Sequence, residues 1–208
     1  MPAMPIIVAF FTAETLYEAE ASRLIHSLDR LGLQHDVVAV ADRGSWAANA
    51  SMTAAFLSDS LAKHKGPIVY VNADAIFWTR PALFEQIDPT TCDIAFHRCN
   101  WGQLANGTLW LSNSDACRSV IQEYAQRVEA CAQPTKDEQR YLDHAIKAAA
   151  GIRIQQLPAS YCYIHDIMPP INAGDIVIEH LQASREAKQS KWLPSRRKRL
   201  IDIEHALV

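Results

Sequence analysis

The stretch Ile68-Val-Tyr-Val-Asn-Ala-Asp74 is a largely β-branched apolar run that ends abruptly in two polar side chains. Such a run is typical of a strand buried on both faces of a parallel sheet. Open α/β sheets bind ligands beyond the carboxyl ends of their strands, so the pattern predicts a polar site here. Asn72 and Asp74 are two residues apart and therefore point the same way from an extended backbone. We expect them to bind one ligand together, and a divalent cation carrying a diphosphate suits their oxygen atoms.

The N-terminal segment predicts two further strands beside this one. Residues Ile6–Phe11 form a short, continuous apolar run, and Asp36–Ala41 form another. Between them Leu24, Leu28 and Leu31 repeat at helical spacing. The order strand, helix, strand implies a parallel pair joined by a right-handed crossover.

The rest of the chain alternates between helical and extended patterns in the same way. Further helices are expected over residues 47–64 and 81–87, after Ser114 and around Tyr141, and further strands over residues 92–97, 107–112, 153–157 and 176–180. We therefore predict a single α/β domain with a mixed, mostly parallel sheet flanked by helices. It is expected to occupy residues 1–186, followed by a basic C-terminal tail or helix over residues 187–208.

The composition is that of an ordinary soluble globule of 208 residues, with 49% hydrophobic and 21% charged side chains. A net charge of −3 argues against general affinity for nucleic acid or membranes. The five cysteines are odd in number and include no C-x-x-C pair, which favours a reducing compartment. The N-terminus lacks a signal-peptide pattern, and no apolar run approaches the ~18 residues of a membrane span. These patterns predict a cytoplasmic protein.

A second strand end supplies a partner for Asp74. The β-branched run Ile176-Val-Ile-Glu-His180 ends in an imidazole, and late strands in such folds lie close to early ones. One carboxylate and one imidazole, completed by phosphate oxygens and water, satisfy Mn²⁺ or Mg²⁺. The alternative is that Asp74 is a turn residue and that His180 is an ordinary hydrogen-bonded histidine.

Several short motifs in serial order carry a family resemblance. After the strand, helix, strand opening come Trp46, Asn72-Ala-Asp74, Pro81, Asn106-Gly-Thr108, Asp137-Glu-Gln139, Leu157-Pro158, Ile178-Glu-His180 and Gln182-Ala-Ser-Arg185. In that order and at those spacings the chain resembles a GT-A glycosyltransferase of the nucleotide-diphospho-sugar transferase type, over roughly residues 5 to 186. The resemblance implies a GT-A fold and the transfer of a hexosyl or pentosyl group from a nucleotide-diphosphate sugar, with a UDP-sugar as the expected donor.

The resemblance also implies roles for single residues. Asn72-Ala-Asp74 stands where the family has its Asp-x-Asp motif, so Asp74 would be a ligand of Mn²⁺ or Mg²⁺, with His180 as the second protein ligand. The implied donor-binding residues are Phe11, Thr12, Ala13, Asn72, Asp74, Asn106, Gly107 and Arg185. Asp137 and Gln139 would face the donor sugar, with Asp137 near the reacting carbon. Retention of anomeric configuration is expected by family analogy alone.

Two departures from the family pattern affect the expected site. Asn72 replaces the usual first acidic residue, which removes one negative charge and lowers the expected metal affinity. Met52 stands where many relatives carry a lysine. These changes leave two explanations open, namely a tuned donor specificity or a partial loss of catalysis.

The acceptor is less well defined than the donor. Trp101, in a polar loop, is a candidate stacking residue, and His165 and Asp166 are candidates for the acceptor side. The acceptor itself is a glycan, a small molecule or, given the basic run Ser195–Arg199, a modified DNA base. The competing hypotheses are a non-catalytic nucleotide-sugar-binding module and a nucleotidyltransferase, although the first strand is not followed by the glycine-rich loop that the latter requires.

Overall fold

The computed structural model describes residues 3–131 and 138–207. The elements in chain order are β1 (Ile6–Thr12), α1 (Tyr17–Arg30), β2 (His35–Val40), α2 (Trp46–Ala50), α3 (Thr53–Lys63), β3 (Ile68–Val71), β4 (Ala75–Phe77), η1 (Ala82–Glu85), β5 (Ile94–Arg98), β6 (Leu104–Leu111), α4 (Asp115–Glu129), α5 (Glu138–Ala148), β7 (Ile154–Gln156), η2 (Ala159–Tyr161), η3 (Ala173–Asp175), β8 (Ile178–His180), α6 (Ser184–Ala187) and α7 (Leu193–Leu207).

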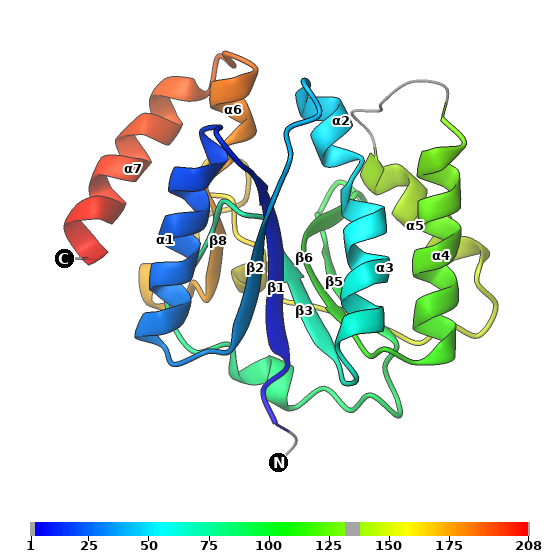
Figure 1. The fold of residues 1–208 in the computed structure, drawn as a ribbon. Helices are drawn as coiled ribbons and strands as arrows, with labels where there is room; N and C mark the ends of the chain where they lie inside the picture. Colours follow the sequence, from blue (N-terminus) through cyan, green and yellow to red (C-terminus); the bar gives the residue numbers. More distant parts are fainter. Residues whose placement is uncertain (1–2, 132–137, 208) are drawn as a thin grey trace.

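Six strands form the central sheet, in the order β2-β1-β3-β6-β5-β7 (Figure 1). Strand β6 runs antiparallel to both of its neighbours, and the other pairs are parallel. The prediction of a mixed, mostly parallel sheet flanked by helices is therefore confirmed. Because β1 and β3 are parallel neighbours, their carboxyl ends meet at one edge of the sheet, where Asn72 and Asp74 follow β3.

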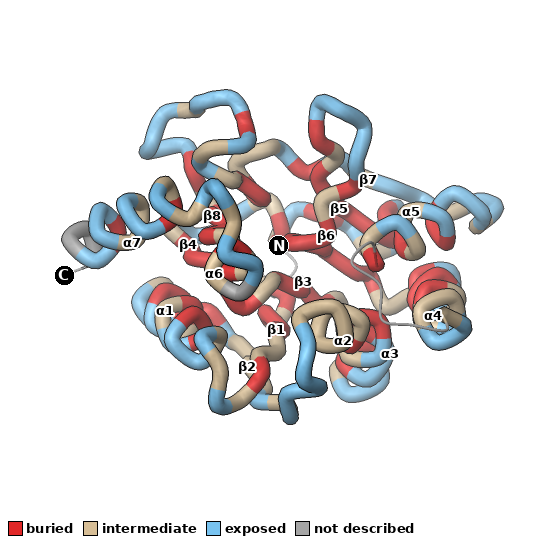
Figure 2. Tube along the Cα trace, turned by 90° about the horizontal axis from the view of Figure 1, so that it is seen from above, coloured by how far each residue is buried: buried red, intermediate tan, exposed pale blue. Residues whose placement is uncertain are grey.

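Period-two alternation along the strands builds a core on each face of the sheet. Ile7 and Ala9 pack on the face covered by α1, whereas Val8 packs on the face covered by α3, α4 and α5. Val69 and Tyr70 divide between the two cores in the same way. Viewed along the strands in Figure 2, the buried central strands lie between these two layers, with α7 beside β4 and β8 on the α1 side.

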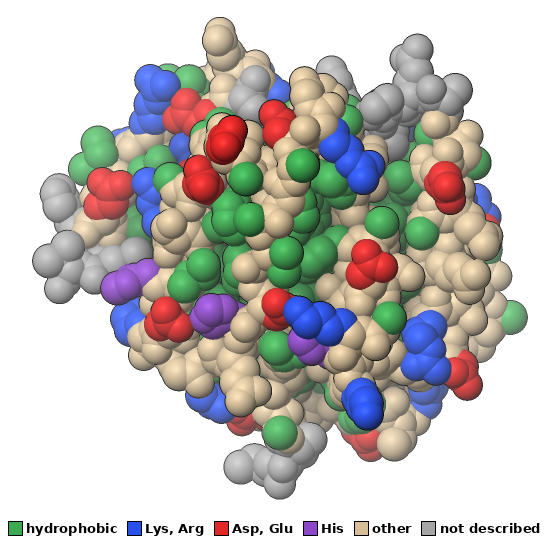
Figure 3. Space-filling model, in the orientation of Figure 1, with side chains coloured by type: hydrophobic (Ala, Val, Ile, Leu, Met, Phe, Trp, Pro, Cys, Tyr) green, Lys and Arg blue, Asp and Glu red, His purple; other side chains and the backbone are tan. Residues whose placement is uncertain are grey.

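Strand β2 forms one edge of the sheet and is less buried than the central strands. Figure 3 shows hydrophobic side chains gathered over this edge, between α1 and α3, with charged groups around them. Val37 packs against the core on the α1 side. The edge is therefore continuous with the core and is only partly shielded by the flanking helices.

The helix expected over residues 47–64 is two helices, α2 and α3. The Ser51 hydroxyl donates to the carbonyl of Ala47, and the Thr53 hydroxyl donates to that of Ala50. Such side-chain bonds compete with the regular helical pattern and explain the break. Met52, at the junction, is buried and does not line the cavity described below. The residue at the position of the family lysine is therefore part of the core.

The basic run near the C-terminus lies in helix α7, which packs against the body of the domain (Figure 1). Arg196 forms an ion pair with Glu20 of α1, and both side chains are buried. Arg199 binds both carboxylate oxygens of Glu179 on β8, at 2.8 and 2.7 Å. These two arginines therefore hold the helix to buried carboxylates. The division of the chain at residue 186 stays a prediction.

Candidate active site

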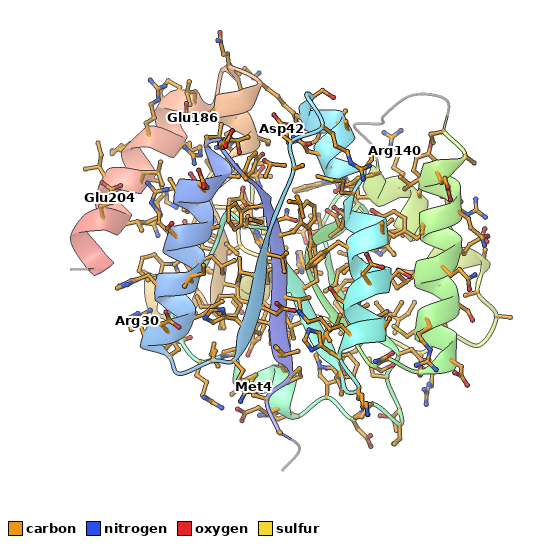
Figure 4. The ribbon with its side chains drawn as sticks, in the orientation of Figure 1. Met4, Arg30, Asp42, Arg140, Glu186 and Glu204 are labelled. Carbon is orange, nitrogen blue, oxygen red and sulfur yellow. The ribbon has the colours of Figure 1, made fainter. Side chains whose placement is uncertain are left out.

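A cavity of about 440 Å³ opens at the carboxyl ends of β1 and β3. It brings together nine of the predicted site residues, namely Phe11, Thr12, Asn72, Asp74, Trp101, Asn106, Gly107, Gln139 and His180. Figure 4 labels Glu186, Asp42 and Arg140 around this end of the molecule, with Met4 and Arg30 at the opposite end. The cavity thus lies where the strand-end rule places ligands in open α/β sheets.

A small second sheet brings Asp74 and His180 together. Strand β4 begins directly after Asp74 and pairs antiparallel with β8, so that Ala75 lies opposite His180. The Asp74 carbonyl accepts a hydrogen bond from the Leu181 amide at 2.9 Å, and Oδ2 accepts one from the Ala183 amide at 2.7 Å. Oδ1 of Asp74 then lies 3.8 Å from Nδ1 of His180. Strand β4 is too short to have been recognised in the sequence.

Strand β6 fixes the imidazole from the other side. The Thr108 hydroxyl lies 2.9 Å from Nε2 of His180, a contact that orients the ring and directs Nδ1 toward Asp74. Gly107 makes room for the ring, because a Cβ at this position would lie 3.0 Å from Cε1 of His180. Both residues belong to the Asn106-Gly-Thr108 motif, whose contact with His180 was not predicted.

Asp74 and His180 present two buried, inward-facing polar atoms. Among the described residues, Oδ1 of Asp74 and Nδ1 of His180 have no hydrogen-bond partner. Burial alone would raise the pKa of the Asp74 carboxyl, but His180 and the Ala183 amide outweigh it and hold the pKa below its usual range. Burial alone would lower the pKa of His180, but the Cys162 side chain and Asp74 raise it to about 10. The pair therefore attracts a positive charge, either a proton on the ring or a cation between the two atoms.

This donor set fits a hard divalent cation that shares its coordination with a ligand. One carboxylate oxygen and one imidazole nitrogen are ligands that Mn²⁺ accepts, and a ring nitrogen suits Mn²⁺ better than Mg²⁺. In the part of the chain that the structure describes, no three His, Cys, Asp or Glu side chains are placed to hold a metal. Asp74 and His180 would thus supply two positions and leave the others to phosphate oxygens and water.

Asn72 is oriented by its neighbours in the sheet. Its Oδ1 accepts a hydrogen bond from the Tyr70 hydroxyl at 2.9 Å, and its backbone N–H donates to the Gly107 carbonyl. The Tyr70 hydroxyl takes one of the two acceptor positions of Oδ1, and the neutral Nδ2 group offers donors to a ligand. Asn72 is therefore better suited to a ribose hydroxyl or a phosphate oxygen than to a metal ion.

The part of the cavity next to α1 and α2 contains residues that the sequence did not single out. Tyr17, at the start of α1, lines the cavity, and burial raises the pKa of its hydroxyl well above the ordinary value, so the hydroxyl stays protonated. Lys188 follows α6 and places Nζ 3.3 Å from the ring centroid of Trp46 on α2. These elements meet only in the folded chain, and no local sequence signal identifies the contact.

Next to Asn106, a carboxylate adjacent in sequence to the predicted one lines the cavity. Asp137 lies outside the described residues, so its place is not part of the observed site. Glu138, the first residue of α5, is buried, and its Oε1 accepts a hydrogen bond from Asn106 Nδ2 at 3.0 Å. Gln139 lines the same part of the cavity. Glu138 was not among the predicted site residues, although it lies between Asp137 and Gln139 in the motif.

Four predicted site residues lie apart from the cavity lining. The Ala13 amide donates to the Val40 carbonyl and continues the β1–β2 ladder. Arg185 and Asp166 form a two-pronged ion pair with N–O distances of 2.5 and 2.6 Å. Together with the exposed His165, they line a small depression next to α7. The structure therefore gives Arg185 a structural partner where a diphosphate contact was expected, and it places Asp166 and His165 outside the cavity wall.

The sequence matches no protein-family model and no curated protein sequence. The fold is similar to that of several solved glycosyltransferases. A glycosyltransferase involved in the glycosylation of the major capsid of PBCV-1 superposes with a TM-score of 0.66 at 14% identity, over 90% of this chain and 98% of that chain. GlyE of Streptococcus pneumoniae TIGR4 gives 0.62 at 13% identity, over 85% of this chain and 54% of that chain. Mouse xyloside xylosyltransferase 1 gives 0.53 at 12% identity, over 86% and 98%.

These similarities confirm the predicted fold, which is that of GT-A glycosyltransferases. The chain spans about half the length of GlyE and nearly the whole length of the other two. At such low identity the comparison concerns the fold, and the activity has to be argued from the site. No helix in the described ranges has the length and apolar character needed to cross a membrane.

Proposed function

We propose that this chain is a glycosyltransferase that moves a hexosyl or pentosyl group from a nucleotide-diphosphate sugar to an acceptor hydroxyl. The observation that carries the proposal is the buried pair of Asp74 Oδ1 and His180 Nδ1, which lie 3.8 Å apart without hydrogen-bond partners among the described residues. This pair lines a cavity of about 440 Å³ at the strand ends of a fold shared with glycosyltransferases. A binding site for a metal-bound diphosphate accounts for all of these features.

Some of these side chains would bind the metal and the nucleotide, and others hold the metal ligands in the required orientation. Asp74 and His180 would hold Mn²⁺ or Mg²⁺, and Thr108 keeps the imidazole in the orientation that this requires. When bound, the cation neutralises the negative charge that develops on the leaving diphosphate. Asn72 donates to the ribose or to a phosphate oxygen. Trp46, which lines the cavity and carries Lys188 over its ring, would contact the nucleotide base.

The opposite part of the cavity would receive the sugar. Glu138 holds Asn106 in place, and Gln139 adds an amide next to them. We assign the donor sugar to this corner, with Asp137 keeping its predicted role near the reacting carbon. A UDP-sugar donor and retention of configuration remain part of the proposal by analogy with the fold.

Calorimetry with UDP, in the presence and absence of Mn²⁺, tests the site directly. The wild-type protein is expected to bind UDP more tightly with Mn²⁺, and Asp74→Asn and His180→Gln are expected to weaken that binding at least about tenfold. Asp59→Asn, on the exposed face of α3, is the matched control and should behave as wild type. Wild-type protein that shows no metal-dependent nucleotide binding would overturn the proposal.

A second candidate, the non-catalytic nucleotide-sugar-binding module, is favoured by one observation. The Asn72 side chain is an uncharged amide whose oxygen also accepts from Tyr70, so this residue does not replace the second acidic ligand of the family motif. Mass spectrometry of donor hydrolysis across a panel of sugar nucleotides with Mn²⁺ separates the two functions. Metal-dependent binding of UDP without turnover of any donor would favour the binding module.

A further inference from the structure

We infer that the end of the cavity beyond the donor sugar binds an acceptor whose reacting sugar carries an uncharged, apolar aglycone, such as an alkyl or aryl group. This inference rests on the proposed function, because it names the acceptor class of the same site. It is carried by one wall of the cavity, which we call the acceptor wall. The acceptor wall consists of Cys99, Trp101, Gln103, Leu104, Ile164 and Ile167.

The first feature of the acceptor wall is an exposed but fixed tryptophan. Trp101 lies in the tight turn between β5 and β6, where the Gly102 amide donates to the Cys99 carbonyl and the Cys99 amide donates to that of Gln103. The ring nitrogen Nε1 donates to Gln103 Oε1 at 3.1 Å, and the side chain is 55% exposed. A ring held by its turn loses little conformational entropy when a ligand packs against it.

The second feature is a branched aliphatic side chain on a separate turn. The amides of Ile167 and Met168 both donate to the Ile164 carbonyl, which shapes this turn. Ile167 is 44% exposed, yet it lines the same cavity as Trp101. Single exposed hydrophobic side chains are common, but two from different turns at one cavity indicate a binding surface.

The third feature is the absence of available charge on this wall. None of its six side chains is charged at neutral pH, since burial raises the pKa of the Cys99 thiol. Nearby, Arg98 forms an ion pair with Asp143 at 2.7 Å and donates to the Gly102 carbonyl, and Asp166 is paired with Arg185. An acceptor with phosphate groups would need cations here. The acceptor wall therefore favours an apolar group over nucleic acid or another polyanion.

The test compares aryl and methyl glycosides of the same sugars. 4-Nitrophenyl and methyl β-glycosides of glucose, galactose and xylose are titrated into protein that holds UDP and Mn²⁺, and saturation-transfer NMR shows which ligand protons contact the protein. We expect at least one nitrophenyl glycoside to bind about tenfold more tightly than its methyl partner, with the strongest transfer to the aryl protons.

Two variants at the wall and one control locate the effect. Trp101→Ala and Ile167→Ser are expected to reduce the aryl preference to twofold or less. Trp192→Ala, a similarly exposed tryptophan that does not line the cavity, should leave the preference unchanged. UDP–Mn²⁺ binding should be at the wild-type level in all three variants, which also shows that they are folded.

Three results would overturn the inference. These are equal binding of nitrophenyl and methyl glycosides, an aryl preference that survives both wall variants, and binding of a single-stranded oligonucleotide that depends on Trp101. Each of them leaves UDP–Mn²⁺ binding intact and so refutes the acceptor class alone. Loss of UDP–Mn²⁺ binding in the wild-type protein would instead refute the proposed function.

Discussion

Substitution of Gly107 by alanine tests the contact on which the proposed metal site depends. A Cβ at this position would lie 3.0 Å from Cε1 of His180 and 3.2 Å from both ring nitrogens. Ordinary contacts of a Cβ begin at about 3.4 Å, so the imidazole must move by about 0.4 Å or the strand must give way. The ring has little freedom, because Nε2 contacts Thr108 and the His180 amide donates to the Tyr163 carbonyl at 2.8 Å.

The expected loss of metal binding is larger than the loss of stability. Metal–ligand distances are held to within about 0.2 Å, so a displacement of about 0.4 Å takes His180 out of bonding range. We expect the affinity for UDP–Mn²⁺ to fall at least about tenfold. Overpacking costs about 1–3 kcal/mol, and the reduced freedom of the unfolded chain offsets about 0.4–1 kcal/mol of it. A net loss near 1–2 kcal/mol corresponds to a fall in Tm of about 2–8 °C at this chain length.

Calorimetry with UDP and Mn²⁺ gives the affinity, and thermal unfolding without ligand gives the stability. Gly174→Ala is the matched control, because a Cβ there meets nothing within 4 Å. It should keep the affinity of the wild type, and its Tm should be equal to that of the wild type or slightly higher. Gly107→Ala protein that binds UDP–Mn²⁺ with wild-type affinity would show that the position of His180 does not determine metal binding, and the reasoning would fail.

The remaining predictions concern a ring partner and two ion pairs. Thr108→Val removes the hydroxyl that orients His180 at 2.9 Å, and it should lower Mn²⁺ affinity about tenfold; unchanged binding in a Mn²⁺ titration would contradict this. Arg199→Met leaves the fully buried carboxylate of Glu179 on β8 without a countercharge. It should lower the free energy of unfolding in urea by about 3 kcal/mol, and a loss below about 0.5 kcal/mol would refute this prediction. Hydrogen bonds from Arg153 hold the pKa of Asp93 below its usual range, so this carboxylate contributes stability above the unfolded pKa of about 3.9 and loses it only in stronger acid. The stability difference between wild type and Asp93→Asn should therefore be constant between pH 5 and 8 and shrink below about pH 4, and a difference that grows there would refute the assignment.

Local sequence was enough to predict the sheet and one half of the candidate site. The apolar runs that became β1 and β3 are continuous because these strands are buried on both faces. Asn72 and Asp74 could be placed at a strand end because the apolar run stops abruptly before them. In open α/β sheets the carboxyl ends of the strands form the ligand-binding edge. His180 was found for the same reason, from the end of its own β-branched run.

Other contacts could not be predicted from the sequence, because the partners lie elsewhere along the chain. Arg185 follows β8 as the family motif requires, yet it is paired with Asp166. Arg196 and Arg199 belong to the basic C-terminal run, and their partners Glu20 and Glu179 lie in α1 and β8. A charge cluster shows that countercharges are needed and does not show where they are.

The sequence by itself determined that the chain is an α/β domain with a carboxylate after its third strand, because strand burial and strand ends are encoded within a few neighbouring residues. The tertiary structure alone decided what that carboxylate faces. Pairing of β4 with β8 sets Asp74 beside His180, and Ala183, 109 residues along the chain from Asp74, supplies the amide that fixes the carboxylate. Gly107 then leaves room for the ring. Contacts between such distant segments have no local signature, since they form only when the packed layers bring strand ends to one edge.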